Sequence, residues 1–425
     1  MRTDEAGASQ AVEDRTETDT ERRRILRGLR YCFMVFLCVR VGLSVLALLA
    51  VALLPHPSAI GEAAGIPQPV NVPGWLAPTI SPGWHNLFTA WERFDALWFL
   101  RIATAGYTDG DGSAAFFPLY PMLIRIASPV LGGHPLAAGI LISNAAFLGA
   151  LIVLYFLTSS EFDERIARRT VLYLAIFPSA YFFLAPYSES LFLLLVVASL
   201  WAARREKWAL AGVTGALAAV TRNVGVLLVL PLAVEGIHQF RERGGRLAPR
   251  LLWSGAVAVG TLAYLGFWQG FGGDALAPLH QQATWQREAA EICLWIIGCV
   301  PFPPATLLRG TGEAFRWIGQ YPGGYHLFDW LLVVPALVAA VWATMRARPT
   351  FSVYAWASLI APLSLVFAPR PFMSFPRFLL AVFPLFWATA VWAGRRAGVH
   401  ETVVAVSAAG LGLMTVLFVN WYFVF

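Results

Sequence analysis

The chain has 425 residues, of which 58% are hydrophobic and only 13% are charged. Soluble domains carry about 25% charged residues, so this composition excludes a water-soluble globular protein and predicts a polytopic membrane protein. The net charge of +6 comes from short basic clusters between apolar runs. That pattern is typical of cytoplasmic loops and excludes a nucleic-acid-binding surface.

The N-terminal region combines a polar tail with a membrane anchor. Residues 1–30 are predicted to form a cytoplasmic tail, acidic and disordered over its first 21 residues. The tail ends in five arginines: Arg22, Arg23, Arg24, Arg27 and Arg30. An apolar run from Tyr31 to Leu54 follows, which is too long for a signal-peptide core. We therefore expect a retained spanning helix whose basic end is cytoplasmic.

Residues 55–134 contain no clean span and are predicted to form the first outer loop. Four of its apolar residues recur on one helical face: Trp91, Phe94, Trp98 and Ile102. This spacing predicts an amphipathic helix over residues 84–105 that lies along the outer membrane surface. Asp95 follows Trp91 by four residues and falls near the same face. Prolines interrupt residues 116–131, which predicts a re-entrant or interfacial segment.

Ten further apolar stretches complete a predicted all-α integral membrane bundle of about eleven helices. They cover residues 135–158, 168–184, 188–203, 207–221, 223–239, 251–270, 326–345, 352–368, 377–394 and 401–421. The proline-rich stretch 291–310 is assigned to a second outer loop, 271–325, because a crossing there would place Arg346 and Arg348 outside. The prediction is one transmembrane domain over residues 31–425, with an outer C-terminus.

Ionisable residues gather on one side of this topology, at the outer ends of helices or in outer loops. They are Asp95, Glu189, Arg222, Asp274, His280, Arg287 and Arg377. Such a group costs roughly 2.5–3.5 kcal/mol at the centre of a bilayer, so each one requires a structural or functional reason. The pattern predicts a polar cavity that opens to the outer face.

Asp95 is the candidate general base, because sugar transfer from a good leaving group needs one carboxylate to take the acceptor's proton. The alternative is an interfacial aspartate that caps a helix or pairs with Arg93 or Arg101. Arg377, at the outer start of a predicted helix, and Arg222 could each grip a phosphate with parallel hydrogen bonds. The alternative for both is a topological charge near a helix end.

Glu189, in a tight outer turn, is expected either to pair with an arginine or to bind sugar hydroxyls. The following loop mixes an aromatic ring with hydrogen-bonding groups: His280, Gln282, Trp285 and Arg287. That mixture suits a carbohydrate or diphosphate surface, and equally an ordinary hydrated loop. No cysteine spacing for zinc and no P-loop or GxGxxG element is present, so no cofactor is expected and any sugar donor should be carried by a lipid. Dependence on a divalent ion is left open.

An ordered series of short motifs resembles the PIG-V mannosyltransferase family, within the GT-C class of lipid-phosphate-sugar-dependent glycosyltransferases. The matching stretches are 94–99 with 105–107, 116–121, Ser143-Asn144 with Phe147, 177–180, 187–192, Thr221-Arg222, then His280, Gln282, Trp285 and Arg287, and finally 376–378 with 383–386. Two positions depart from the family pattern, because Phe94 precedes Asp95 and Phe378 follows Arg377. Both departures keep an aromatic residue.

The resemblance implies inverting transfer of mannose from polyprenyl- or dolichyl-phosphate mannose to a lipid-linked or glycan acceptor, on the non-cytoplasmic face of what we expect to be a bacterial plasma membrane. It also implies that Asp95 is the catalytic carboxylate. Trp91 and Trp98 are candidate contacts for sugar or acceptor. The rival hypotheses are a transporter or lipid flippase, a non-catalytic scaffold of envelope assembly, and a related enzyme for another sugar.

Overall fold

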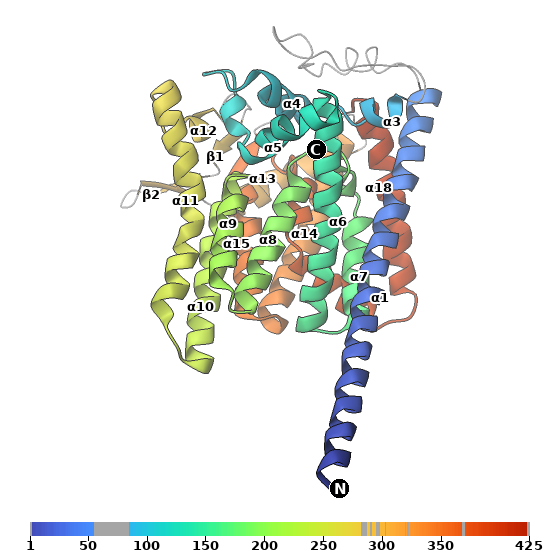
Figure 1. Ribbon diagram of the computed structural model, residues 1–425. Helices are drawn as coiled ribbons and strands as arrows, with labels where there is room; N and C mark the ends of the chain where they lie inside the picture. Colours follow the sequence, from blue (N-terminus) through green and yellow to red (C-terminus); the bar gives the residue numbers. More distant parts are fainter. Residues whose placement is uncertain are drawn as a thin grey trace.

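The computed structural model describes residues 2–54, 85–281, 287–289, 291–294, 298–301, 303–318, 320, 323–367 and 370–422. Its helices stand side by side as a bundle, with short helices gathered at one end (Figure 1). Six described helices are long and apolar enough to cross a membrane, or seven if one bent pair is counted as a single span. The structure therefore confirms a multi-pass helical protein but not the predicted count of about eleven spans.

The N-terminal helix α1 (Arg2–Leu53) is continuous with the segment that was predicted to be disordered. Residues 2–20 extend it away from the bundle (Figure 1). Alanine and glutamate, each present three times in residues 2–20, have high helix propensity and favour this extension. The part of α1 beyond Tyr31 packs against α6 and α18, as expected of the membrane anchor.

Helices α6 to α11 follow along the chain, and α10 and α11 stand at the edge of the bundle (Figure 1). They are α6 (Pro135–Glu161), α7 (Glu164–Ala175), α8 (Glu189–Arg204), α9 (Trp208–Ala219), α10 (Val229–Arg243), which follows the 3₁₀ helix η5 (Asn223–Leu228), and α11 (Leu247–Gly272). Close approach of α9 and α11 depends on glycine, since a Cβ on Gly260 would lie 2.2 Å from the carbonyl oxygen of Ala216. Small residues allow this contact between spanning helices because lipid supplies no hydrophobic drive for their association.

The predicted span over residues 168–184 is wrong in its second half, because α7 ends at Ala175. Pro178 and Pro186 disfavour helix there, and the chain continues through the short 3₁₀ helix η4 (Ala180–Phe183) to the start of α8. This irregular backbone is buried, and side chains satisfy it. Asn144 donates to the carbonyl oxygen of Leu184 at 3.1 Å, and the Ser143 hydroxyl donates to that of Tyr187 at 2.9 Å. Non-helical backbone is tolerated within a membrane only where it is buried in protein and its polar groups are hydrogen-bonded.

The C-terminal half contains shorter and bent elements. They are α13 (Pro303–Arg316), α14 (Gly323–Arg346), α15 (Pro349–Ser364), α16 (Phe375–Phe378), η7 (Leu379–Ala381), α17 (Pro384–Ala393) and α18 (Val399–Val419). The predicted span 377–394 is instead a pair of helical segments that meet at 85°. Pro384 stands at this break, because proline starts a helix but cannot continue one.

The predicted all-α fold class is confirmed, and four short strands accompany the helices. Strand β1 (Arg287–Ala289) pairs antiparallel with β4 (Leu365–Phe367), which follows α15 directly and ends the predicted span 352–368 early. Strands β2 (Glu291–Leu294) and β3 (Gly298–Pro301) form a hairpin. The apolar stretch 291–310 therefore begins as a hairpin and continues into α13, in agreement with the prediction that it is not a spanning helix.

The single amphipathic helix predicted for residues 84–105 is wrong, because the structure has two helices, α3 (Asn86–Thr89) and α4 (Asp95–Ala105), with a break between them. Tertiary hydrogen bonds hold the break open. Arg93 donates to the carbonyl oxygens of Thr89 at 2.8 Å and of Val419 on α18 at 2.9 Å. The Tyr187 hydroxyl donates to the carbonyl oxygen of Arg93 at 2.8 Å. After the 3₁₀ helix η2 (Ser113–Ala115), the proline-rich stretch forms α5 (Leu119–Ala127) and η3 (Ser128–Leu131), as the non-spanning expectation required.

At the end of the bundle opposite α4, a buried carboxylate joins three elements. Glu235 on α10 is fully buried and accepts from Arg204 at 3.1 Å, from Arg348 at 3.0 Å and from Gln239 at 2.7 Å. The Thr350 hydroxyl also donates to it. Because the charge is removed from water, these partners are what make its burial tolerable.

We expect Glu235→Gln to lower the free energy of unfolding by about 2–3 kcal/mol, since two guanidinium groups then lose a charged partner. Arg204 and Arg348 keep Glu161 and Glu242 as second partners, which limits the loss. Reversible unfolding in mixed detergent micelles measures the change. The matched control is Glu164→Gln, whose partners Arg24 and Arg168 are both accessible to solvent, and it should change stability by less than about 1 kcal/mol. Equal effects of the two substitutions would contradict the role assigned to burial.

Candidate active site

Asp95 is the first residue of α4, and the backbone before it has an unusual conformation. Phe94 has φ +52°, a value that side-chain-bearing residues rarely adopt, and its ring packs on Phe418 and Trp421 at centroid distances of 5.8 and 5.3 Å. A carboxylate in the first turn of a helix is favoured by the helix dipole. The side chain of Asp95 keeps 25% of its surface exposed. Packing of the preceding ring thus fixes where the carboxylate stands.

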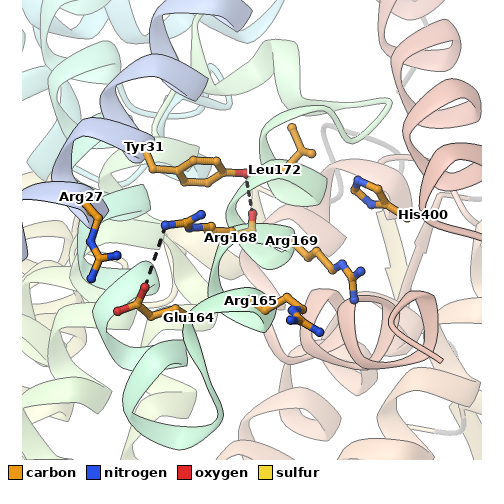
Figure 2. Close-up of a pocket in the computed structure, with 8 residues that line it drawn as sticks. All are labelled: Arg27, Tyr31, Glu164, Arg165, Arg168, Arg169, Leu172 and His400. Atoms are coloured by element: carbon orange, nitrogen blue, oxygen red, sulfur yellow. Dashed lines mark hydrogen bonds and ion pairs between the residues drawn. The ribbon is translucent and has the colours of Figure 1, made fainter. Parts of the chain in front are cut away.

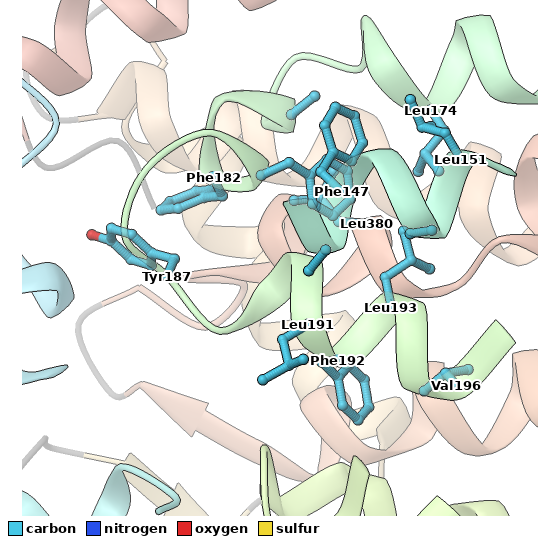
Figure 3. Close-up of a cluster of buried hydrophobic side chains, with 14 of the residues drawn as sticks. Phe147, Leu151, Leu174, Phe182, Tyr187, Leu191, Phe192, Leu193, Val196 and Leu380 are labelled. Atoms are coloured by element: carbon cyan, nitrogen blue, oxygen red, sulfur yellow. The ribbon is translucent and has the colours of Figure 1, made fainter. Parts of the chain in front are cut away.

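Arg377 is the partner of Asp95, 282 residues later in the chain. Its Nη1 donates to Asp95 Oδ2 at 2.5 Å, and its Nε donates to Glu189. Its guanidinium carbon lies 4.9 Å from the ring centroids of both Phe182 and Tyr187. These rings project from the irregular segment before α8, beside the apolar cluster that contains Phe147 and Leu380 (Figure 3). Two carboxylates and two aromatic rings therefore immobilise one guanidinium.

Glu189 begins α8 and lies deepest in the cluster, with 5% of its side chain exposed. Its Oε1 accepts from Arg377 and also from Arg222 Nη1 at 2.5 Å. Arg222 precedes η5 and also donates to the Ser188 hydroxyl at 3.3 Å. The four residues Asp95, Glu189, Arg222 and Arg377, which we call the carboxylate–arginine cluster, thus carry two negative and two positive charges. Asp95 is the most exposed of the four.

The two tryptophans near Asp95 are packing residues. Trp91 lies in the break between α3 and α4, is fully buried, and has the Arg40 guanidinium 5.4 Å from its ring. Trp98 is 6% exposed, stacks on Phe116 at 5.4 Å, and lies 5.3 Å from the Arg101 guanidinium. Neither ring presents a free face, so the prediction that they bind sugar is not supported by this geometry.

The second predicted loop contributes differently from the expectation. His280, in the short helix α12 (Ala277–His280), lies 2.8 Å from Asp274 on an exposed surface, and this hydrogen bond lowers the pKa of Asp274. Gln281 anchors the loop instead, because its Oε1 accepts from the backbone N–H groups of Gly112 and Ala114. Gln282 and Trp285 lie outside the described residues, and Arg287 is described only as the strand partner of Phe367. Within the described chain, no contact joins His280 to the carboxylate–arginine cluster.

Sequence reasoning overlooked a second buried ion pair near this site. Arg370 donates to both carboxylate oxygens of Asp329, at 2.6 and 2.8 Å, and both side chains are buried. Asp329 lies within the predicted span 326–345, so a lone carboxylate in an apolar run was the available signal. The pair fixes the segment that leads to Ser374 (φ +68°) and on to Arg377.

Among the described residues, no group of three or more His, Cys, Asp or Glu side chains is placed to hold a metal ion.

The sequence was compared with models of protein families, and the model for mannosyltransferase (PIG-V) matches residues 34–249, just over half of the chain. The chain belongs to the PIG-V mannosyltransferase family. The matched range includes Asp95, Glu189 and Arg222 of the cluster, whereas Arg377 lies beyond it. No curated protein matches the sequence.

Solved structures with similar folds are distant in sequence. ArnT from Cupriavidus metallidurans bound to undecaprenyl phosphate is 15% identical, with a TM-score of 0.42 over 77% of this chain and 70% of that chain. The Archaeoglobus fulgidus oligosaccharyltransferase with Zn and sulfate is 13% identical, with a TM-score of 0.40 over 91% of this chain and 53% of that one. The PIG-V family member thus spans about half the length of the archaeal enzyme.

We expect Glu189→Gln to lower the free energy of unfolding by about 3 kcal/mol, because two buried guanidinium groups lose their shared carboxylate. Arg222→Gln should cost less, since Glu189 then keeps Arg377. The double variant should be no less stable than Glu189→Gln alone, because removing Arg222 also removes its uncompensated charge. Unfolding of the three variants in mixed micelles tests this. Simple additivity of the two single effects would contradict a shared ion-pair network.

Proposed function

We propose that this protein transfers mannose from polyprenyl- or dolichyl-phosphate mannose to a glycolipid or glycan acceptor on the non-cytoplasmic face, and that Asp95 is the general base. One observation carries the proposal: a partly exposed carboxylate, Asp95, is held directly beside a guanidinium, Arg377, that is itself anchored from behind by Glu189. A base next to a phosphate-binding cation is what transfer from a lipid phosphate requires.

The reaction follows from these positions. Asp95 accepts the proton of the acceptor hydroxyl as that oxygen forms its bond to the anomeric carbon of mannose. The bond from that carbon to the phosphate oxygen breaks, and the electron pair leaves with the lipid phosphate, so no separate general acid is required. Attack opposite the leaving phosphate inverts the configuration and gives an α-mannoside. The exposure of Asp95, 25% against 5% for Glu189, supports its assignment as the base.

The donor phosphate is assigned to Arg377 with help from Arg222. Nε of Arg377 donates to Glu189, and Nη1 donates to the more exposed Asp95. A phosphate oxygen can therefore replace the Asp95 carboxylate at Nη1 while Glu189 keeps its hydrogen bond. Once a phosphate oxygen takes that position, Asp95 is released to meet the acceptor hydroxyl. The four charges of the cluster cancel, so the phosphodiester adds one negative charge that the two guanidinium groups share.

We expect Asp95→Asn to reduce kcat by about 10²–10⁴-fold, because the amide cannot accept the proton. The measurement is mannose transfer from synthetic polyprenyl-phosphate mannose, with the purified variant in liposomes. The matched control is Asp111→Asn, which removes a carboxylate that is also paired with an arginine, Arg101 at 2.6 Å, in the same loop. The control should keep turnover within about threefold of the wild type. Wild-type turnover by Asp95→Asn would end the assignment of the base.

A further inference from the structure

A second cluster of charge lies at the opposite end of the bundle from Asp95. A cavity of about 450 Å³ is bounded by α1, α7 and α18, and its lining is basic (Figure 2). The lining residues are Arg27, Tyr31, Glu164, Arg165, Arg168, Arg169, Leu172 and His400. The C-terminal end of α18 receives Arg93 near the candidate active site, whereas His400 is at its other end. The 21 residues of α18 separate the two by about 30 Å, the thickness of a bilayer core.

The charges of this pocket are not balanced within the described chain. Its lining has four guanidinium groups and one carboxylate, Glu164. That carboxylate is already hydrogen-bonded to Arg24 at 2.9 Å, and Arg168 lies 3.9 Å from it. Arg165 and Arg169 have no carboxylate within ion-pair distance in the part of the chain that the structure describes. The four guanidinium groups nevertheless line one cavity, where Arg27 and Arg165 are exposed to solvent and Arg168 and Arg169 are partly buried.

The surroundings indicate which anion fits. Met34 lies on the face of α1 that carries Arg27 and Tyr31, farther toward the middle of the bundle, and its side chain is 48% exposed. Val41 continues this face and is 52% exposed. An apolar surface thus begins where the basic pocket ends, as a lipid with a charged head group and acyl chains requires. Residues 2–20 of α1 project away from the bundle, so the acidic start of the chain does not occupy the pocket (Figure 1).

We propose that this pocket binds the phosphate group of an anionic membrane lipid. The guanidinium groups of Arg165 and Arg169 grip the phosphate oxygens, and the acyl chains follow the apolar face of α1 beyond Tyr31. The bound lipid ties α1, α7 and α18 together on the membrane face opposite to the carboxylate–arginine cluster. This site is independent of sugar transfer.

The test is a native mass spectrometry titration of the purified full chain in detergent. The probes are dioleoyl phosphatidic acid, dioleoyl phosphatidylcholine, which has the same chains but a neutralised head group, and inorganic phosphate as a competitor. We expect one phosphatidic acid per chain, bound at least tenfold more tightly than phosphatidylcholine and not displaced by equimolar inorganic phosphate. Equal binding of the two lipids would overturn the proposal. Displacement by equimolar inorganic phosphate would show that the pocket binds a soluble anion, and this result would also overturn the proposal.

Variants assign the binding to the pocket. Arg165→Gln with Arg169→Gln should weaken phosphatidic acid binding at least tenfold, whereas Arg165→Lys with Arg169→Lys keeps the charge and should retain most of it. The matched control is Arg241→Gln with Arg346→Gln, which removes two exposed positive charges outside the pocket and should change affinity less than twofold. Unfolding midpoints of all three double variants verify that they fold. A control that loses binding as much as the pocket variant would show that net charge alone attracts the lipid, which would refute the site.

Discussion

A single buried guanidinium, that of Arg377, links three segments that are far apart in the chain. It joins the start of α4 through Asp95 and the start of α8 through Glu189, while its own helix α16 is one turn long. A charge buried at this depth is tolerated only when oppositely charged groups and hydrogen bonds surround it. The same requirement that makes the ion pairs necessary for folding also places a carboxylate beside the guanidinium that we propose binds phosphate.

The irregular backbone between α7 and α8 is what makes this contact geometrically possible. Because α7 ends at Ala175, the chain turns under the site and presents Phe182 and Tyr187 to the guanidinium. Side chains from α6 satisfy two of its carbonyl groups, those of Leu184 and Tyr187, inside the bundle. Ser143 and Asn144 thus stabilise the backbone segment that presents Phe182 and Tyr187 to the guanidinium.

Charge is distributed at both ends of the bundle, in two different ways. At the Asp95 end, carboxylates and guanidinium groups are equal in number and form a closed, partly buried network. At the other end, both oxygens of Glu235 accept hydrogen bonds, whereas the pocket between α1, α7 and α18 has an excess of guanidinium groups. The closed networks stabilise the fold, and the excess is available to a bound anion. The two proposals, a lipid-phosphate donor at one end and an anionic lipid at the other, both rely on guanidinium groups that bind phosphate.

The sequence by itself determined the membrane class, and it named the four members of the carboxylate–arginine cluster among seven ionisable candidates, because apolar length, basic loops and ionisable residues near the bilayer are local signals. The sequence also predicted that 291–310 does not span the membrane, because a crossing there would place Arg346 and Arg348 on the outer side. Only the tertiary structure decided that α3 and α4 are separate, because Arg93 opens that break through Val419, more than 300 residues away. Likewise, only three-dimensional packing buried Trp91 and Trp98 and paired Arg377 with Asp95 and Glu189. Periodicity records which residues share a face of one helix, whereas these contacts depend on how separate elements meet.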